Sequence, residues 1–205
     1  MSKSGIILTS FSRRLQLVPP EPALDEILAT HRTHPETLKY LRILPDRMTV
    51  EEIRSRREKR AADDTAVDFC AFTLNDDGSR NEFIGTTAVF KIDVEQNNCE
   101  IGILVAPEKH GGGYGTEMLY CVMQWVFEEK NFHRATFETA VDNIPMQKWF
   151  EKTGIRLEAE RKEAWRGINT GEYEDVKGYA VLEWEWRDRI KANLETRIRA
   201  RWGLL

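Results

Sequence analysis

A run of glycines between Glu100 and Glu117 is the part of the chain whose spacing best indicates chemistry. Residues 101–105 are apolar, as in a buried strand, and Pro107 follows them. Residues 116–127 then have the apolar periodicity of a helix. A glycine-rich turn from a strand into a helix brings backbone N–H groups close to an anion, and the helix dipole favours negative charge. The spacing therefore predicts a phosphate site.

Three known phosphate-binding patterns can be compared with this loop. A P-loop needs Lys and then Ser or Thr after its last glycine, but Thr116 and Glu117 follow Gly115. A dinucleotide fingerprint needs G-x-G-x-x-G, and Thr116 stands at the third glycine. The third pattern, Q/R-x-x-G-x-G/A, is similar to the pyrophosphate loop of acyl-CoA-dependent N-acetyltransferases, and here His110 replaces Gln or Arg. A glycine-rich turn without any ligand is the alternative to all three.

The composition excludes several other classes of protein. A chain of 205 residues is long enough for one domain with a sizeable core. Its net charge of −4 argues against nucleic acid as the main partner. The three cysteines have no paired spacing and the four histidines are scattered, so neither a disulfide framework nor a metal site is expected. The only early apolar run, residues 5–8, is too short for a signal or a membrane span, which predicts a cytoplasmic protein without membrane partners.

The remaining segments alternate between strand and helix patterns, with no repeat and no linker. Strands are expected at residues 14–18, 67–74, 82–92, 134–141, 157–164 and 176–186, and helices at 23–33, 37–44, 49–62, 144–152 and 187–201. Thr49 and Glu52 have the spacing of a capping box, and Gly154 that of a helix C-cap. These patterns predict one mixed α/β domain with a helical C-terminal tail.

With these elements placed, the chain resembles the GCN5-related N-acetyltransferase (GNAT) superfamily over residues 14–186. It is most similar to the branch of ribosomal-protein N-terminal acetyltransferases of the RimJ/RimL type. The motifs that carry the resemblance are RRLQL at 13–17, FIG at 83–85, CEIG at 99–102, GYGT followed by Glu117, Asn143 with EKTGI at 151–155, and GEYED at 171–175 with Tyr179. Their common order and spacing make the resemblance specific.

The resemblance implies a fold and a domain organisation. The GNAT fold is a mixed α/β fold in which a mostly antiparallel, twisted central sheet is flanked by helices and its fourth and fifth strands splay apart. It would occupy residues 1–186 of this chain. Residues 187–205 would form a basic helix packed on the domain or extending from it. We expect a monomer or a homodimer.

The resemblance also implies that acetyl-CoA binds where the two strands splay. The pantetheine would pair with the backbone of Ile103, Leu104 and Val105, and a backbone N–H near Leu104 would stabilise the oxyanion. Residues expected to contact the cofactor in the loop are His110, Gly111, Gly112, Gly113, Tyr114, Gly115 and Thr116. Asn143 is expected to hold the CoA arm or to cap the helix after it, and Phe150 to pack against the pantetheine or the core.

Catalysis by direct attack of an amine needs a proton acceptor, because only a neutral amine is nucleophilic. Glu100 is the expected base, acting through a water, because the family often keeps an acid at this point. Glu138 is its rival and Glu163 a third candidate. The family's usual general acids are replaced by Phe150 and Met146.

The expected function is transfer of acetyl from acetyl-CoA to a primary amine through a ternary complex. The acceptor is a protein N-terminus or a small-molecule amine. An open groove between residues 37–47 and 165–171 would favour a peptide, and a closed pocket a small amine. The alternatives are a CoA-binding module that has lost turnover, suggested by Phe150 and Met146, and a nicotinamide-cofactor protein.

Overall fold

The structure is a computed structural model that describes residues 5–204. The strands are β1 (Leu8–Thr9), β2 (Leu15–Val18), β3 (Val67–Leu74), β4 (Arg80–Asp93), β5 (Asn98–Val105), β6 (Arg134–Ala140), β7 (Arg156–Arg166) and β8 (Tyr173–Leu182). The α-helices are α1 (Asp25–Thr33), α2 (Pro35–Leu38), α3 (Val50–Ala62), α4 (Tyr114–Gln124), α5 (Ile144–Thr153), α6 (Glu183–Glu185) and α7 (Lys191–Trp202). Two π-helical segments, Trp125–Glu129 and Trp186–Ile190, continue α4 and join α6 to α7.

All eight strands form one sheet in the order β1-β2-β3-β4-β5-β6-β8-β7. Neighbours are antiparallel except β5 and β6, which run parallel. These two strands pair only at their first three residues, from Asn98 with Arg134 to Glu100 with Thr136. Beyond Glu100 they separate. The predicted fold, a mostly antiparallel sheet with two splayed central strands, is therefore confirmed.

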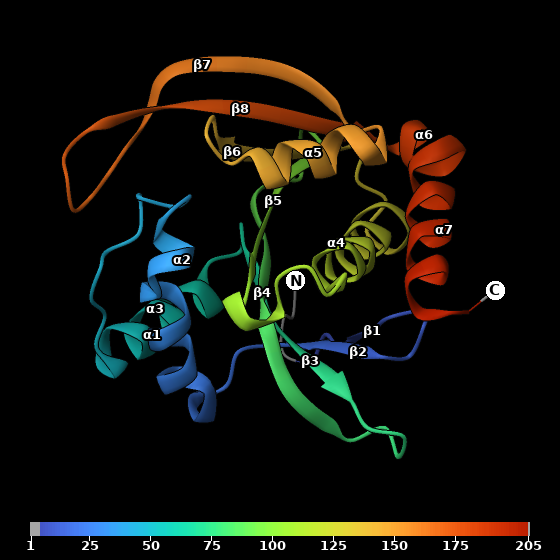
Figure 1. Cartoon of the computed structure of the whole chain (residues 1–205), viewed down its shortest axis with the longest axis horizontal. Coiled ribbons are helices and arrows are strands. Elements are labelled where there is room, and N and C mark those ends of the chain that lie inside the picture. Colours follow the sequence, from blue (N-terminus) through green and yellow to red (C-terminus); the bar gives the residue numbers. More distant parts are fainter. Residues whose placement is uncertain (1–4, 205) are drawn as a thin grey trace.

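Helices cover both faces of the sheet (Figure 1). On one face, α4 packs on the main core, which includes Cys99 and Ile101 of β5 and Phe137 of β6. On the other face, α1 and α3 bury a smaller cluster that contains Ile53 and Cys70. Because side chains alternate along a strand, Glu100 and Gly102 lie on this second face. Glu138 shares it, since Thr136 is opposite Glu100 and Glu138 is two residues further along β6.

Local sequence signals explain most element boundaries. Thr49 and Glu52 form the predicted capping box at the start of α3, each side chain bonding the other's backbone N–H. Gly154 ends α5 in the left-handed conformation (φ 75°), as its C-cap position requires. Strand β3 has the predicted bounds.

Two predicted boundaries are wrong, one because of a local helix cap and the other where tertiary hydrogen bonds hold the segment. The last strand ends at Leu182 rather than at residue 186, because Glu185 accepts a hydrogen bond from the Leu182 N–H and starts a helix. The helix expected at 37–44 ends at Leu38. After Leu38 the segment is held by the β7–β8 hairpin, whose residues Ile168 and Asn169 donate hydrogen bonds to the carbonyls of Arg42 and Leu44.

The C-terminal helix α7 is part of the packed structure. Leu194 and Ile198 are buried in the main core, and Tyr120 of α4 donates a 2.6 Å hydrogen bond to Glu195. Within residues 5–204, no helix is long and apolar enough to cross a membrane.

Candidate functional site

The separation of β5 from β6 leaves one edge of β5 without a strand partner. Residues 101–105 bond to β4 on one side, and no residue of β6 pairs with them on the other. An unpaired strand edge presents N–H and C=O groups that an extended ligand can bond. The predicted pantetheine-binding residues Ile103, Leu104 and Val105 all lie on this segment.

The backbone groups of β5 point alternately toward β4 and toward the wedge between β5 and β6. The Leu104 carbonyl points toward β4. It accepts a 3.2 Å hydrogen bond from Nε2 of His31, and a Cβ on Gly85 of β4 would approach it to 2.1 Å. The carbonyls of Cys99 and Val105 point to the wedge. Thr136 of β6 donates to the first, and Nε2 of His110 donates to the second at 3.0 Å. By this alternation, Ile103 and Val105 supply the wedge-facing groups.

The glycine loop, residues 111–115, turns from β5 into α4. Gly113 adopts φ 86° at the N-cap of α4, and no side chain caps the helix. Gly115 lets the first turn of α4 approach β5 closely, because a Cβ there would lie 3.2 Å from Val105 and 3.7 Å from Ile103. The first N–H groups of an uncapped helix are free for an anion. The backbone therefore fits the predicted pyrophosphate site.

Helix α7 supplies a cation to this loop that the spacing of the loop could not reveal. Arg201 donates a 3.1 Å hydrogen bond to the carbonyl of Gly111, and a Cβ on Gly113 would approach its Cγ to 3.1 Å. Trp202, the next residue, packs against Tyr114 at 5.6 Å between ring centroids. A guanidinium beside free helix N–H groups favours phosphate binding.

Helix α5 approaches the start of α4 from the side of β6. The indole N–H of Trp149 donates a 2.9 Å hydrogen bond to the hydroxyl of Thr116. Asn143 caps α5 by accepting a bond from Met146 N–H at 3.2 Å, and its amide donates to Thr139 at 3.0 Å. Asn143 therefore caps α5, which is one of its two predicted roles, and a contact with the CoA arm stays a prediction.

Phe150, which replaces the family's usual Tyr, is fully buried. Its ring stacks on Tyr179 at 4.0 Å between centroids and also contacts Phe137 and Trp149. This aromatic packing accounts for its burial within the protein. A contact with pantetheine stays a prediction.

Glu100 lies at the last residue pair before the strands diverge, and only 8% of it is exposed. Burial raises the pKa of its carboxyl, and the nearby charge of Glu138 acts in the same direction. Lys91 opposes this by a 2.8 Å ion pair, but its side chain is 64% exposed, so the pair is screened by water. The net result is a raised pKa, which suits a general base.

The other two candidate bases differ in their surroundings. Glu138 lies on the same face as Glu100 and bonds Arg161 at 2.5 Å, across Gly178, which has no side chain to obstruct the guanidinium. Glu163 is exposed on β7. The structure thus brings Glu100 and Glu138 together with Lys91 and Arg161, neither of which the spacing of the motifs could indicate.

Other catalytic chemistries find no support in the part of the chain that the structure describes. No group of three or more His, Cys, Asp or Glu side chains is arranged to hold a metal ion there. Cys70, Cys99 and Cys121 are buried as free thiols, and burial raises the pKa of each. A raised pKa disfavours the thiolate, so these residues are poor nucleophiles.

Comparison with known proteins agrees with this geometry. Residues 14–156 match the sequence profile of the family described as "Acetyltransferase (GNAT) domain". The chain belongs to this family. An uncharacterized N-acetyltransferase, YnaD, from Bacillus subtilis is 27% identical over 146 residues, which are 71% of this chain and 82% of that protein. Spermidine N(1)-acetyltransferase from Vibrio cholerae is 25% identical over 114 residues, covering 56% of this chain and 64% of that enzyme.

Solved structures show the same fold. Spermidine N-acetyltransferase from Vibrio cholerae, solved in complex with CoA and spermine, superposes with a TM-score of 0.75 at 19% sequence identity. The superposition covers 85% of this chain and 99% of that one. Our GNAT protein is thus an acetyl-CoA-dependent acetyltransferase. Its assignment to the RimJ/RimL-like branch stays a prediction.

Proposed function

We propose that this GNAT protein transfers acetyl from acetyl-CoA to the amine of a small molecule, with Glu100 as the base. The observation that carries this proposal is the position of Glu100. It is a buried carboxylate with a raised pKa, placed where the β5 edge becomes free. A base there can remove the proton of an amine entering from the α1–α3 face of the sheet.

Residues on the opposite side of the wedge would hold acetyl-CoA, which supplies the thioester. The N–H groups at the start of α4 and the guanidinium of Arg201 would bind the pyrophosphate. The wedge-facing backbone of Ile103 and Val105 would bond the pantetheine. Because the Leu104 carbonyl is turned toward His31, the N–H groups of Ile103 and Val105 are better placed than that of Leu104 to stabilise an oxyanion in the wedge.

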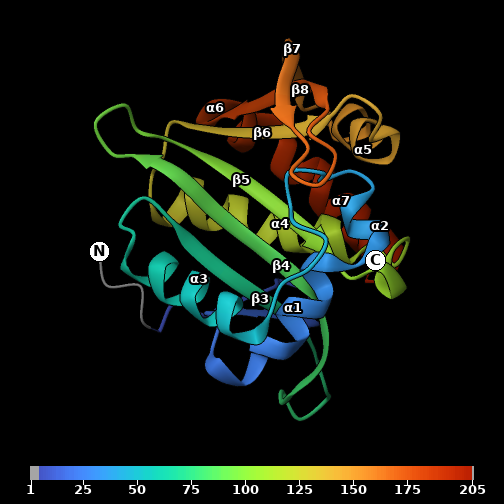
Figure 2. The ribbon, with the colours of Figure 1, turned by 90° about the vertical axis from the view of Figure 1, so that its left-hand side faces the viewer.

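A small acceptor is favoured by a closed bridge over the α1–α3 face. The segment after α2 meets the tip of the β7–β8 hairpin, as Figure 2 shows. Ile168 N–H bonds the Arg42 carbonyl at 2.9 Å, and Asn169 bonds both the Leu44 carbonyl and the Asp46 N–H at 3.1 Å. The two segments that would border a peptide groove are therefore joined to each other.

The Arg42 side chain strengthens this bridge. It bonds Asp142, between β6 and α5, at 2.5 Å and Glu174 of β8 at 2.7 Å. Both acidic partners raise its pKa, so it stays charged at any working pH. An acceptor must fit beneath this bridge, which disfavours a folded protein or a long peptide.

The relatives support amine acetylation in general. The one relative named above whose name specifies a substrate acetylates spermidine. At 25% identity its acceptor is not carried over to this chain.

The test is release of CoA thiol from acetyl-CoA with a panel of small amines and N-terminal peptides. We expect turnover with at least one small amine and none with peptides. Peptide turnover alone would overturn the assignment of a small acceptor. Turnover with no amine, together with stabilisation by CoA in thermal unfolding, would favour the CoA-binding module that Phe150 and Met146 suggest.

A further inference from the structure

An excess of positive charge lies on the same face of the sheet as Glu100. We define the arginine cluster as Arg32 of α1 and Arg56 and Arg60 of α3, together with Asp68 of β3. Three guanidinium groups and one carboxylate give a formal charge of +2 (3 − 1). Arg60 already donates two hydrogen bonds to Asp68, from Nε at 2.8 Å and from Nη2 at 2.5 Å. Asp68, the carboxylate of the cluster, is therefore already bonded.

Arg32 and Arg56 are left without a bonded carboxylate in the part of the chain that the structure describes. Nε of Arg32 is buried and has no hydrogen-bond partner within residues 5–204. Burial lowers the pKa of Arg32 to about 10, and the charge of Arg56 acts in the same direction. Burial also lowers the pKa of Arg56, with Arg60 adding to it. The charge of Asp68 acts on both, but Asp68 is bonded to Arg60, so these two partly buried guanidinium groups have no directly bonded carboxylate among residues 5–204, which favours an anion beside them.

A pocket of about 300 Å³ opens on this part of α3. It is lined by Glu52, Ser55, Arg56, Lys59 and Arg60. Glu52 contributes one negative charge to this lining, and its Oε2 accepts hydrogen bonds from the N–H and the hydroxyl of Thr49 in the capping box. The three cations of the lining outnumber this carboxylate, and Ser55, Arg56 and Lys59 carry hydrogen-bond donors suited to an anion.

The strand register places the arginine cluster within reach of the wedge. Asp68 on β3, Ala88 on β4 and Gly102 on β5 lie directly opposite one another on three adjacent strands. Two strand spacings separate Asp68 from Gly102, a distance of about 10 Å. Phe90 lies between them. Its ring would touch a Cβ on Gly102 at 3.0 Å, and Arg60 lies 5.8 Å from the ring centroid.

We propose that the arginine cluster binds an anionic group of the acceptor, a carboxylate or a phosphate, while its amine lies at Glu100 and an apolar spacer crosses Phe90. This proposal rests on the proposed function and names its substrate class, an amino acid or amino phosphate of moderate length. It distinguishes this protein from a polyamine acetyltransferase. A polyamine would place a second cation against Arg32 and Arg56, which like-charge repulsion disfavours.

The kinetic test compares acceptors that differ only in their far end. ω-Amino carboxylates and ω-amino phosphates of increasing length are assayed beside the neutral alkylamine and the diamine of the same length. We expect the anionic acceptors to have the highest kcat/KM. R56Q should lower their kcat/KM by about tenfold, mainly through KM, and leave the neutral amine unchanged, which corresponds to the loss of one charged hydrogen bond. R56K keeps the positive charge and should retain part of the kcat/KM that R56Q loses with anionic acceptors.

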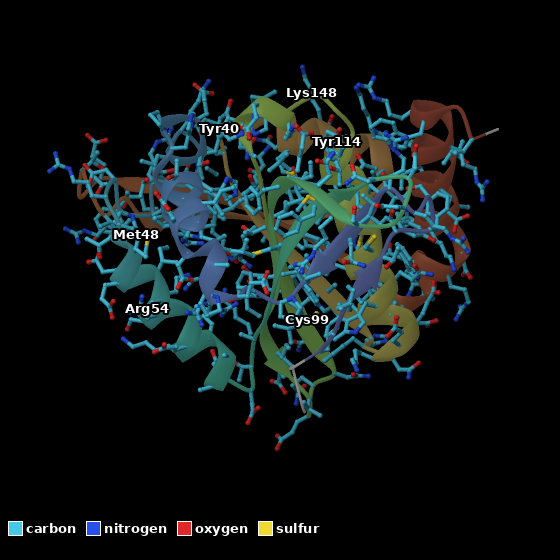
Figure 3. All side chains as sticks on the ribbon, turned by 90° about the horizontal axis from the view of Figure 1, so that it is seen from below. Tyr40, Met48, Arg54, Cys99, Tyr114 and Lys148 are labelled. Carbon is cyan, nitrogen blue, oxygen red and sulfur yellow. The ribbon has the colours of Figure 1, made fainter. Side chains whose placement is uncertain are left out.

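The matched control is Arg54 of the same helix. Its side chain is 49% exposed, pairs with Glu51, and lies at the outside of α3 (Figure 3). R54Q removes the same charge from the same helix and should leave kcat/KM unchanged for both the anionic and the neutral acceptors. Equal losses in R54Q and R56Q, equal losses for neutral and anionic amines, or a preference for the diamine would each overturn the proposal.

A binding measurement keeps the arginine cluster testable if no amine is acetylated. Inorganic phosphate and acetate are titrated separately into the wild-type protein at constant ionic strength, set with sodium chloride, while the Arg Nε–H resonances are followed by NMR. Saturable shifts at Arg32 and Arg56, absent in R56Q and retained in R54Q, support an anion site and show which anion it prefers. Shifts that do not saturate, or that also appear at Arg54, overturn it.

Discussion

His31 of α1 donates its Nε2–H to the carbonyl of Leu104 on β5, at 3.2 Å. A carbonyl can only accept, so Nε2 carries the proton and Nδ1 is a buried acceptor, which has no partner among residues 5–204. The imidazole is 5% exposed and lies edge-on to Phe83 at 5.3 Å. One neutral histidine thus connects the α1 layer to the strand that carries the wedge.

This contact predicts a loss of stability in mild acid. Burial lowers the pKa of folded His31 to about 4, against 6.5 in the unfolded chain. Between these values the unfolded state binds the extra proton, so the free energy of unfolding falls as pH falls from about 6.5 to about 4. The full loss is about 3 kcal/mol. Denaturant unfolding of wild type and H31Q across this range measures it, and an equal pH slope in both would contradict the assignment.

The histidine also shows where sequence reasoning had to stop. The strand, the glycine loop and the helix that follow one another from Glu100 to Gln124 could be predicted, because their signals are local. So could the capping box of Thr49 and Glu52 and the bounds of β3. His31 lies 73 residues from Leu104, and no periodicity in either segment indicates that the two meet.

The same reason explains what was missed at the site. Lys91 and Arg161 reach Glu100 and Glu138 from β4 and β7, and Arg201 reaches the glycine loop from the far end of the chain. Ion pairs between distant segments depend on the sheet order. Family resemblance supplied that order for the strands but not for these individual side chains.

The backbone conformation of Gly113 predicts a coupled loss of stability and cofactor affinity. G113A places a Cβ at φ 86° and 3.1 Å from Arg201 Cγ, so we expect a loss of about 1–2 kcal/mol in stability. The displaced loop should also bind acetyl-CoA several-fold more weakly. Isothermal titration with acetyl-CoA and denaturant unfolding measure the two effects.

Gly78, in the turn between β3 and β4, offers a matched control for that experiment. It adopts φ 81°, and a Cβ there would meet no atom within 4 Å. G78A therefore introduces similar backbone strain away from the glycine loop. If G78A weakens acetyl-CoA binding as much as G113A does, the loop is not the phosphate site.

The guanidinium of Arg201 is expected to contribute to phosphate binding rather than to folding. It is exposed, so R201Q should change the free energy of unfolding by no more than about 0.5 kcal/mol. The KM for acetyl-CoA should rise several-fold, and more at low salt, because the contact is electrostatic. R187Q, at an exposed arginine bonded to Glu183 and Asp188, should leave KM unchanged. An unchanged KM in R201Q would remove Arg201 from the site.

The hydrogen bond from Trp149 to Thr116 should fix α5 against the start of α4. W149F keeps an aromatic ring but loses the N–H donor, which predicts a loss of about 1 kcal/mol in stability. T116S retains the hydroxyl and should retain most of that stability. Denaturant unfolding of both variants measures the two effects. Equal losses of unfolding free energy in W149F and T116S would show that packing, not the hydrogen bond, is responsible.

The pH dependence of turnover should report the charges around Glu100. Its pKa is raised by burial and by Glu138, and lowered by Lys91. If the deprotonated carboxylate is the base, kcat/KM falls as pH falls through this pKa. This fall is the acid limb of the pH profile. E138Q removes a negative neighbour, which lowers the pKa of Glu100 and should move the acid limb to lower pH. K91M removes a positive neighbour, which raises this pKa and should move the limb to higher pH. Profiles are compared with one acceptor, so that its own amine pKa is constant.

E100Q completes this series. Removing the base should lower kcat by about a hundredfold or more and abolish the acid limb that E138Q and K91M displace. Acetyl-CoA affinity, measured by titration, should stay close to wild type because Glu100 faces the acceptor side of the wedge. If E100Q keeps both its rate and its acid limb, Glu100 is not the base. If E138Q instead lowers kcat without shifting the acid limb, Glu138 is the base.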